Sequence, residues 1–193
     1  MVYNKNTLEK GVIILERKQI STQTLVQESK TLKAGDTVLL SGTVYTARDA
    51  AHKRIMQALE SGEPMPFELS GAVIYYAGPT PAPQGMPIGS CGPTTSGRMD
   101  PYTPRLLDLG LAGMIGKGER SQAVIDAIVR NSAVYLCAIG GAGALAARCI
   151  RSAEVIGYED LGCESVKRLR IENFPLIVAI DSCGGNLFSK PSC

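Results

Sequence analysis

Residues 112–139 read AGMIGKGERSQAVIDAIVRNSAVYLCAI, and they indicate the fold class more clearly than any other part of the chain. The stretch divides into a predicted strand at residues 112–115, a predicted helix at residues 121–131 and a second predicted strand at residues 133–139. Val124, Ile125 and Ile128 give the central segment its amphipathic helical spacing. A strand, a helix and a further strand in this order are typical of an α/β protein in which helices pack on a sheet.

The same alternation continues on both sides of this stretch. Apolar or β-rich runs predict further strands at residues 11–15, 36–45, 72–77, 154–158 and 176–180, and apolar spacing predicts helices at residues 49–60, 101–109 and 143–152, with a helical turn or two at residues 164–169. The strands are mostly apolar, so we expect both faces of the sheet to be covered, and the extra strands near the front favour β/β/α layering. We divide the chain into an N-terminal arm, residues 1–31, and a single compact domain, residues 32–193.

Length and composition are those of an ordinary globular protein. The 193 residues are 45% hydrophobic and 20% charged, with a net charge of +2. Such a chain can bury a core, and its near-neutral charge argues against a protein that coats nucleic acid or an anionic membrane. No apolar run approaches the roughly 18 residues that cross a bilayer, and the polar N-terminus lacks the apolar centre of a signal peptide. We therefore expect a cytoplasmic protein with neither a nucleic-acid nor a membrane partner.

The six cysteines lack the spacing of a metal site. No two of them form C-x-x-C, so we expect no zinc ion or iron–sulfur cluster to be bound by this chain alone. Reduced thiols are expected rather than disulfides. The only histidine, His52, falls on a predicted helix, where a structural role is the simpler interpretation.

Residues 78–92 contain four prolines and four glycines. Proline fixes φ and glycine permits positive φ, so this segment predicts irregular backbone. A loop of this length inside a compact domain is usually functional or mobile.

Three loops carry cations or hydroxyls next to a predicted strand end or helix start. They are residues 46–52 with Arg48, residues 92–100 with Thr94 and Arg98, and residues 114–121 with Lys117. Helix N-termini present unpaired N–H groups, and arginine matches a carboxylate bidentately. Two arginines and a lysine suit a small dianion such as a dicarboxylate, with one cationic clamp at each end. In the first loop, we expect Asp49 to cap the following helix.

Each loop also has a simpler interpretation. An arginine after a strand is often only a surface charge. Clustered hydroxyls are often helix caps, and a Gly-Lys-Gly turn is common between regular elements. The third loop is not a P-loop, because the pattern G-x-x-x-x-G-K-[ST] does not occur around Lys117.

Residues 92–103, GPTTSGRMDPYT, resemble the β-subunit of class I, iron–sulfur-dependent fumarate hydratases, a family that includes L(+)-tartrate dehydratase β-subunits. Five markers carry the resemblance in order, at residues 40–52, 92–104, 114–118, 138–142 and 158–162. The resemblance implies a swivelling β/β/α domain and the reversible addition of water to fumarate, giving (S)-malate in the tricarboxylic acid cycle. It also implies a [4Fe–4S] cluster carried by a partner α-subunit, in a hetero-oligomer that is itself dimerised.

The resemblance assigns roles to four residues. Arg48 and Arg98 match arginines that bind the substrate carboxylates, and Lys117 matches a substrate-binding lysine. Thr94 matches a threonine proposed as the catalytic acid/base group. A threonine hydroxyl can act as a base only where neighbouring cations stabilise its alkoxide. The family often has a histidine or lysine where this chain has Cys183, and no role is assigned to that position.

Two alternatives to a fumarate hydratase β-subunit stay open. The first is an L(+)-tartrate dehydratase β-subunit, which differs in a substrate hydroxyl whose recognition we do not locate in the sequence. The second is a stand-alone module that binds a dicarboxylate without chemistry.

Overall fold

The computed structural model describes residues 17–138 and 143–189. Its strands are β1 (Arg17–Ser21), β2 (Thr37–Thr46), β3 (Val73–Tyr75), β4 (Gly113–Gly116), β5 (Val134–Ala138), β6 (Ile150–Gly157) and β7 (Val166–Ile180). Its α-helices are α1 (Leu25–Glu28), α2 (Asp49–Ser61), α3 (Thr103–Asp108), α4 (Gln122–Arg130) and α5 (Gly143–Cys149). Short 3-10 helices lie at Ser29–Thr31, Ser96–Met99 and Glu159–Glu164.

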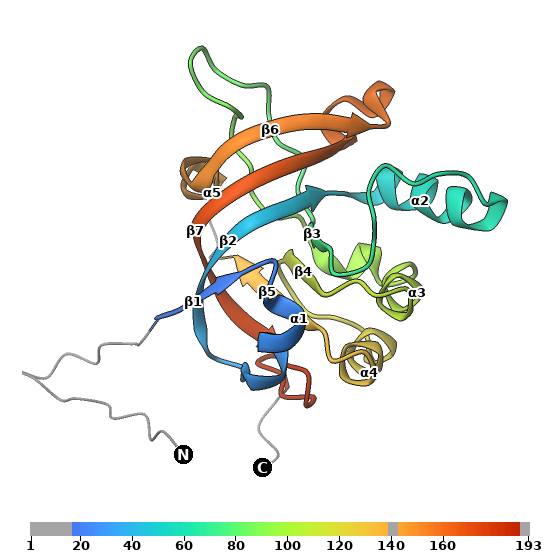
Figure 1. The fold of residues 1–193 in the computed structure, drawn as a ribbon, viewed down its shortest axis with the longest axis vertical. Coiled ribbons are helices and arrows are strands. Elements are labelled where there is room, and N and C mark those ends of the chain that lie inside the picture. Colours follow the sequence, from blue (N-terminus) through green and yellow to red (C-terminus); the bar gives the residue numbers. More distant parts are fainter. Residues whose placement is uncertain (1–16, 139–142, 190–193) are drawn as a thin grey trace, which may run out of the picture.

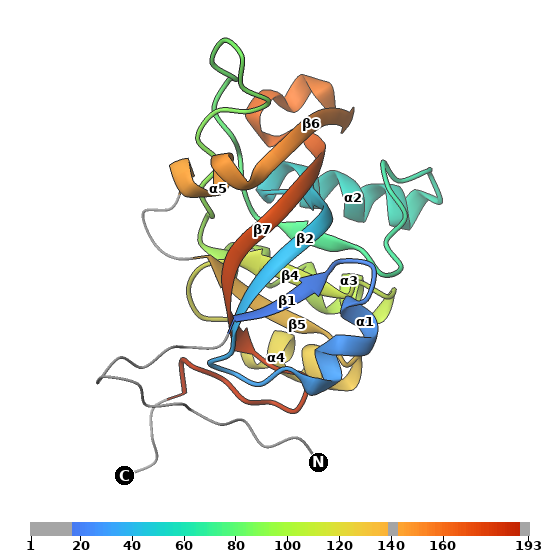
Figure 2. The same ribbon diagram turned by 60° about the vertical axis from the view of Figure 1, so that its left-hand side comes forward.

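The strands form one sheet in the order β1-β2-β3-β4-β5-β7-β6. Strands β2 to β5 are parallel to one another, whereas β7 runs antiparallel to its neighbours β5 and β6. The long strand β7 also pairs with β2, from Thr37↔Ile177 to Thr46↔Lys167 (Figure 2). Because β7 joins β5 to β2, these strands close into a barrel-like sheet, with β1 and β6 outside the ring.

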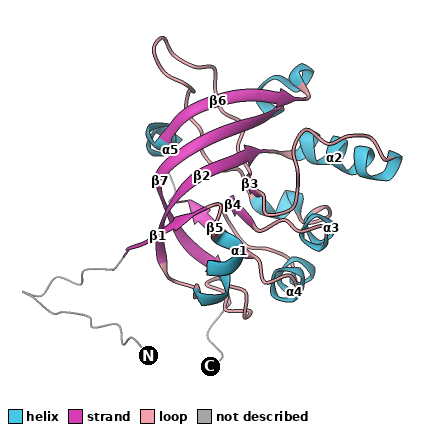
Figure 3. Cartoon of the chain, viewed as in Figure 1, coloured by secondary structure: helices cyan, strands magenta, loops and turns pink. Residues whose placement is uncertain are grey.

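The two faces of the sheet belong to separate hydrophobic clusters, because successive side chains of a strand point to opposite faces. In β5, Leu136 joins the cluster enclosed by the sheet, whereas Tyr135 joins the cluster beneath the helices. The second cluster includes Ile55 of α2, Leu106 of α3 and Ile128 of α4. These three helices lie together along one side of the sheet (Figures 1 and 3). The outer face of the barrel is therefore covered where the helices pack.

The prediction of a strand, a helix and a strand over residues 112–139 is confirmed as β4, α4 and β5. Val124 and Ile128 are buried beneath α4, and Ile125 is partly buried against the same cluster. The segments predicted at residues 36–45, 49–60, 72–77 and 101–109 form β2, α2, β3 and α3, with slightly different ends. A single compact α/β domain is thus confirmed. Residues 78–92 contain neither helix nor strand, as predicted.

The predicted helical turn at residues 164–169 is wrong, because Val166 begins the strand β7. This segment pairs with β6 on one side and with β2 on the other, and these long-range hydrogen bonds override its local helical composition. The helix predicted at residues 143–152 ends at Cys149, where β6 begins and takes in the strand predicted at residues 154–158. The strand predicted at residues 11–15 lies outside the described residues.

The described part of the predicted N-terminal arm takes part in the fold. β1 pairs in parallel with β2, and Leu25 of α1 is fully buried in the cluster that the sheet encloses. The boundary between the arm and the domain stays a prediction.

We expect the enclosed cluster to dominate stability. Val38 of β2 is 0% exposed, whereas Val26 of α1 is 47% exposed. Val38→Ala removes two buried methyl groups and leaves a cavity, so the free energy of unfolding should fall by about 2 kcal/mol. The matched control Val26→Ala should change it by less than about 0.5 kcal/mol. Chemical denaturation of both variants measures the difference, and equal losses would contradict this assignment of the core.

Candidate active site

The three loops predicted to bind a ligand follow strands that lie side by side. Arg48 comes two residues after β2, and Lys117 directly follows β4. The third loop, residues 92–100, is attached to the chain just after β3 and to the loop after β4 through isolated bridges that pair Ala77 with Pro93 and Thr95 with Lys117. Because β2, β3 and β4 are parallel, their carboxyl ends meet at one edge of the sheet. The topology therefore brings the three loops to one end of the barrel.

Arg98 is in direct contact with Thr94. A guanidinium nitrogen of Arg98 donates to Thr94 Oγ1 over 2.6 Å, and the same nitrogen lies 3.0 Å from Asp49 Oδ2. The Arg98 side chain is 47% exposed, so the rest of its fork is open to a ligand from solution. A cation that donates to a hydroxyl oxygen favours the deprotonated form of that hydroxyl. The Asp49 carboxylate offsets part of this positive charge, so Thr94 faces an ion pair and not a lone cation.

Arg48 occupies the N-cap position of α2, and Asp49 is the first residue of the helix. The prediction that Asp49 caps α2 is therefore wrong, because its carboxylate pairs with Arg98 and the N-cap position belongs to Arg48. The Arg48 guanidinium lies 3.5 Å from Glu164 Oε1, and the other oxygen of Glu164 accepts the Ala50 N–H over 3.0 Å. Glu164 thus braces both Arg48 and the first turn of α2.

Gly78 lets the backbone of the proline-rich segment approach Arg48 closely. A Cβ atom at this position would lie only 2.7 Å from a terminal guanidinium nitrogen of Arg48. Arg48 Nε is buried and makes no hydrogen bond to the part of the chain that the structure describes. The arginine is therefore confined between Gly78 and Glu164.

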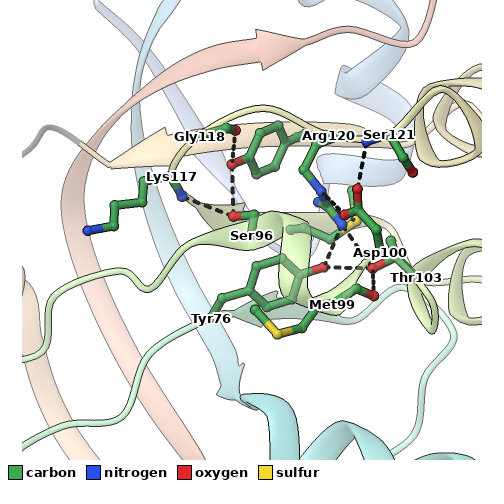
Figure 4. A network of polar contacts seen from close by, with 11 residues as sticks. Tyr76, Ser96, Met99, Asp100, Thr103, Lys117, Gly118, Arg120 and Ser121 are labelled. Atoms are coloured by element: carbon green, nitrogen blue, oxygen red, sulfur yellow. Dashed lines mark hydrogen bonds and ion pairs between the residues drawn. The ribbon is translucent and has the colours of Figure 1, made fainter.

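Lys117 is fixed through its backbone, while its side chain points away from the buried groups behind it (Figure 4). Its N–H donates to Ser96 Oγ over 3.0 Å, and its carbonyl accepts the Ser96 N–H over 2.9 Å. The residue is exposed. These two hydrogen bonds tie the loop that carries Thr94 and Arg98 to the loop that carries Lys117.

A buried polar network lies behind these loops (Figure 4). Arg120 Nε donates to Asp100 Oδ1 over 2.7 Å, and another guanidinium nitrogen donates to Thr103 Oγ1 over 2.9 Å. The guanidinium lies 5.3 Å from the centre of the Tyr76 ring and 4.9 Å from that of Tyr135. Sequence analysis missed this network, because an arginine in a polar, glycine-containing loop carries no signal of burial.

Comparison with known proteins identifies the family of the chain. A model of the family described as the fumarase C-terminus matches residues 3–191. The chain belongs to the fumarase C-terminus family. This finding agrees with the resemblance stated for residues 92–103, and it covers almost the whole sequence.

The chain is similar to fumarate hydratases and to a tartrate dehydratase subunit. The chain is 42% identical over 153 residues to "Fumarate hydratase 1, mitochondrial" of Leishmania major and 40% identical over 153 residues to "Fumarate hydratase class I, aerobic" of Escherichia coli K12. In each case 78% of this chain matches 28% of the relative, so the chain spans little more than a quarter of those enzymes. It is also 37% identical over 170 residues to a protein of Methanocaldococcus jannaschii that is named as an L(+)-tartrate dehydratase subunit beta. That match covers 85% of this chain and 87% of the relative.

The described residues of this fumarase-family chain offer no ligand set for a metal or cluster. They contain no group of three or more His, Cys, Asp or Glu side chains that could hold a metal ion. The cysteines they include, Cys91, Cys137, Cys149, Cys163 and Cys183, are all free. Lys33 Nζ donates to Cys183 Sγ over 3.2 Å. None of the described helices is both long and apolar enough to span a membrane.

A mostly apolar cavity of about 360 Å³ lies beside the proline-rich segment. Its lining includes Pro79, Ile88, Val155, Cys163 and Lys167, but none of the four residues singled out from the sequence. Arg98 and Lys117 are exposed, whereas Arg48 and Thr94 are partly buried. Their roles stay predictions.

His52 is completely buried in α2, one turn after Arg48. Its Nδ1 lies 2.9 Å from the Arg48 carbonyl oxygen, which can only accept, so Nδ1 carries the proton. Burial lowers the pKa of His52 to about 4 despite this hydrogen bond, and the ring is neutral at pH 7. A neutral ring beneath the site agrees with a structural role.

We expect His52 to make stability depend on pH. Its pKa is about 4 in the folded protein and 6.5 ordinarily, so the unfolded chain takes up the proton first as the pH falls. The stabilisation is complete above pH 6.5 and is lost toward pH 4. Between pH 7.5 and 4.5, the wild-type protein should lose roughly 2 kcal/mol more unfolding free energy than His52→Gln. Urea denaturation at each pH measures this, and parallel curves would contradict it.

Proposed function

We propose that this chain is the β-subunit of a hydro-lyase that reversibly adds water to fumarate to give (S)-malate. The observation that carries the proposal is the 2.6 Å contact between Arg98 and Thr94 Oγ1. Arg98 also pairs with Asp49 of the Arg48 loop, and Thr95 is bridged to Lys117. Fumarate is a rigid dianion with one carboxylate at each end. Cations from separate loops suit such a ligand better than the concentrated cradle that a phosphate requires.

In this proposal each residue has a defined task. Arg48 and Arg98 bind the substrate carboxylates, and Lys117 contributes a third positive charge from the opposite loop. Thr94 Oγ1 gives up or takes the proton at the carbon that does not carry the hydroxyl group. The positive charge of Arg98 stabilises the Thr94 alkoxide that forms when the proton leaves. Binding and proton transfer are thus combined in one pair of side chains.

The remainder of the enzyme is proposed to come from a cluster-bearing α-subunit. The match to most of a tartrate dehydratase subunit beta supports a two-subunit enzyme, and the match to only 28% of each fumarate hydratase is consistent with a large partner. We propose that the partner carries a [4Fe–4S] cluster, which supplies a Lewis acid for the substrate hydroxyl. We propose that this chain is a swivelling β/β/α domain and that the surface with the half-exposed Arg98 closes over the partner. We place this dimerised hetero-oligomer in the cytoplasm.

A second candidate is L(+)-tartrate dehydratase. It is supported by the match to 87% of the Methanocaldococcus jannaschii protein, a far larger share than that of any fumarate hydratase named above. The same cations would bind the carboxylates of tartrate, which differs from malate in one additional hydroxyl group.

Reconstitution tests the proposed reaction. This chain, mixed with a cluster-bearing α-subunit, should interconvert fumarate and malate, and the absorbance of fumarate follows the reaction. Each component alone should be inactive. Competition between fumarate and tartrate identifies the preferred substrate. If the reconstituted subunit pair is inactive toward both fumarate and tartrate, the proposal fails. If the isolated chain binds a dicarboxylate with an affinity that the partner does not change, the stand-alone binding module is favoured.

Arg98→Ala tests the site itself. The arginine fork cannot be replaced by water at a carboxylate, so kcat/KM for fumarate should fall roughly 10²- to 10³-fold. Arg130→Ala is a matched control, because Arg130 is 48% exposed and also pairs with an aspartate, but lies at the end of α4. The control should keep full activity, and both variants should unfold like the wild type. Normal turnover by Arg98→Ala would remove this residue from the site.

A further inference from the structure

Arg120 is a buried cation that the proposed reaction does not use. Its side chain is 0% exposed, whereas the Arg98 side chain is 47% exposed. A buried charge is costly unless hydrogen bonds and opposite charge surround it. A sequence that keeps arginine here must therefore supply partners for the whole guanidinium group.

Those partners come from three separate segments. Asp100 and Thr103 accept hydrogen bonds from the guanidinium (Figure 4). The ring centres of Tyr76 and Tyr135 lie 5.3 and 4.9 Å from it. The second oxygen of Asp100 accepts the Ser121 N–H over 2.6 Å, so the carboxylate bridges the arginine side chain and the start of α4. Hydrogen bonds, an opposite charge and two aromatic rings thus surround the Arg120 guanidinium and offset the cost of burying it.

This ion pair links the two loops that carry the proposed substrate-binding groups. Asp100 comes two residues after Arg98, and Arg120 comes three residues after Lys117. A second buried link runs parallel to it. Ser96 Oγ accepts the Lys117 N–H, and the Tyr135 hydroxyl lies 2.8 Å from Ser96 Oγ and 2.9 Å from the Gly118 carbonyl oxygen.

We propose that Arg120 is a positioning residue, which sets the distance between Lys117 and the Thr94–Arg98 pair through its ion pair with Asp100. The reaction in question is the one proposed above. Arg98 and Lys117 project from the surface, so the placement of their charged groups depends on the backbone of their loops. A displacement of about 1 Å between such groups can reduce catalysis roughly 10²-fold.

Arg120→Lys tests this role. Lysine keeps the charge but lacks the planar fork that reaches Asp100 and Thr103 together. In the reconstituted enzyme, kcat/KM for fumarate should fall about 10- to 100-fold at a temperature where the variant is folded. Leu32→Ala is the control, because Leu32 is 1% exposed in the cluster within the sheet and should lower stability without lowering kcat/KM. Unchanged kcat/KM in folded Arg120→Lys, or an equal loss in the control, would overturn the proposal.

A double-mutant cycle distinguishes a positioning role of Arg120 from a purely structural role. If Arg120 acts through Lys117, the losses in kcat/KM caused by Arg120→Lys and Lys117→Met should not add, whereas a purely structural role gives additive losses. Asp100→Asn disrupts the same ion pair by removing the charge of the aspartate. If Arg120→Lys does not fold, Asp100→Asn takes its place in the cycle. Additive losses for the folded variant would refute the role.

Binding of succinate by the full chain distinguishes failure of this inference from failure of the proposed function. Succinate is a dicarboxylate that cannot react, and calorimetry measures its affinity without any partner. Arg120→Lys should weaken that affinity about 10-fold, and Leu32→Ala should not change it. If the reconstituted wild type is inactive but this pattern holds, the function is wrong and the positioning role stands. If succinate binds the wild type and Arg120→Lys equally, the positioning role is wrong. If it does not bind the wild type, the proposed dicarboxylate site is wrong, and the positioning role falls with it.

Discussion

The pairing of β7 with both β2 and β5 is the constraint on which the rest of the structure depends. Without it, β2 and β5 would be the two ends of an open parallel sheet with unpaired backbone groups. With it, the sheet closes, and Val38, Leu40 and Leu136 are enclosed in a core free of solvent. Closure also fixes how the carboxyl ends of β2, β3 and β4 face one another. The loops that carry the candidate site are therefore placed by backbone hydrogen bonds formed elsewhere in the chain.

Two kinds of cation serve this arrangement. Arg98 and Lys117 project from the loops toward solvent, and a ligand can reach them. Arg120 lies behind them and is fully buried, so a ligand cannot reach it. The low dielectric of this buried position strengthens its interaction with Asp100. The exposed cations are suited to bind a dianion, and the buried one to hold their loops. The chain belongs to the fumarase C-terminus family, and a dicarboxylate ligand for the exposed cations agrees with that membership.

Local patterns predicted what depends on local chemistry. The spacing of Val124 and Ile128 identified α4, and the cation-bearing loops were located by their glycines and hydroxyls. Long-range pairing was not predictable in this way. Local composition predicts a helical turn at the start of β7, because the partner strand β2 on one side of it lies about 120 residues away in the sequence. The burial of Arg120 was missed for the same reason, since Tyr76 and Asp100 come from other segments.

The central claim is that cations from three loops bind one dicarboxylate. A crystal structure of the chain bound to its cluster-bearing partner, with malate present, tests it most directly. We expect one malate whose carboxylates contact Arg48 and Arg98, with Lys117 nearby and Thr94 Oγ1 facing a carbon between them. A malate bound elsewhere, or these side chains occupied only by groups of the partner protein, would contradict the claim.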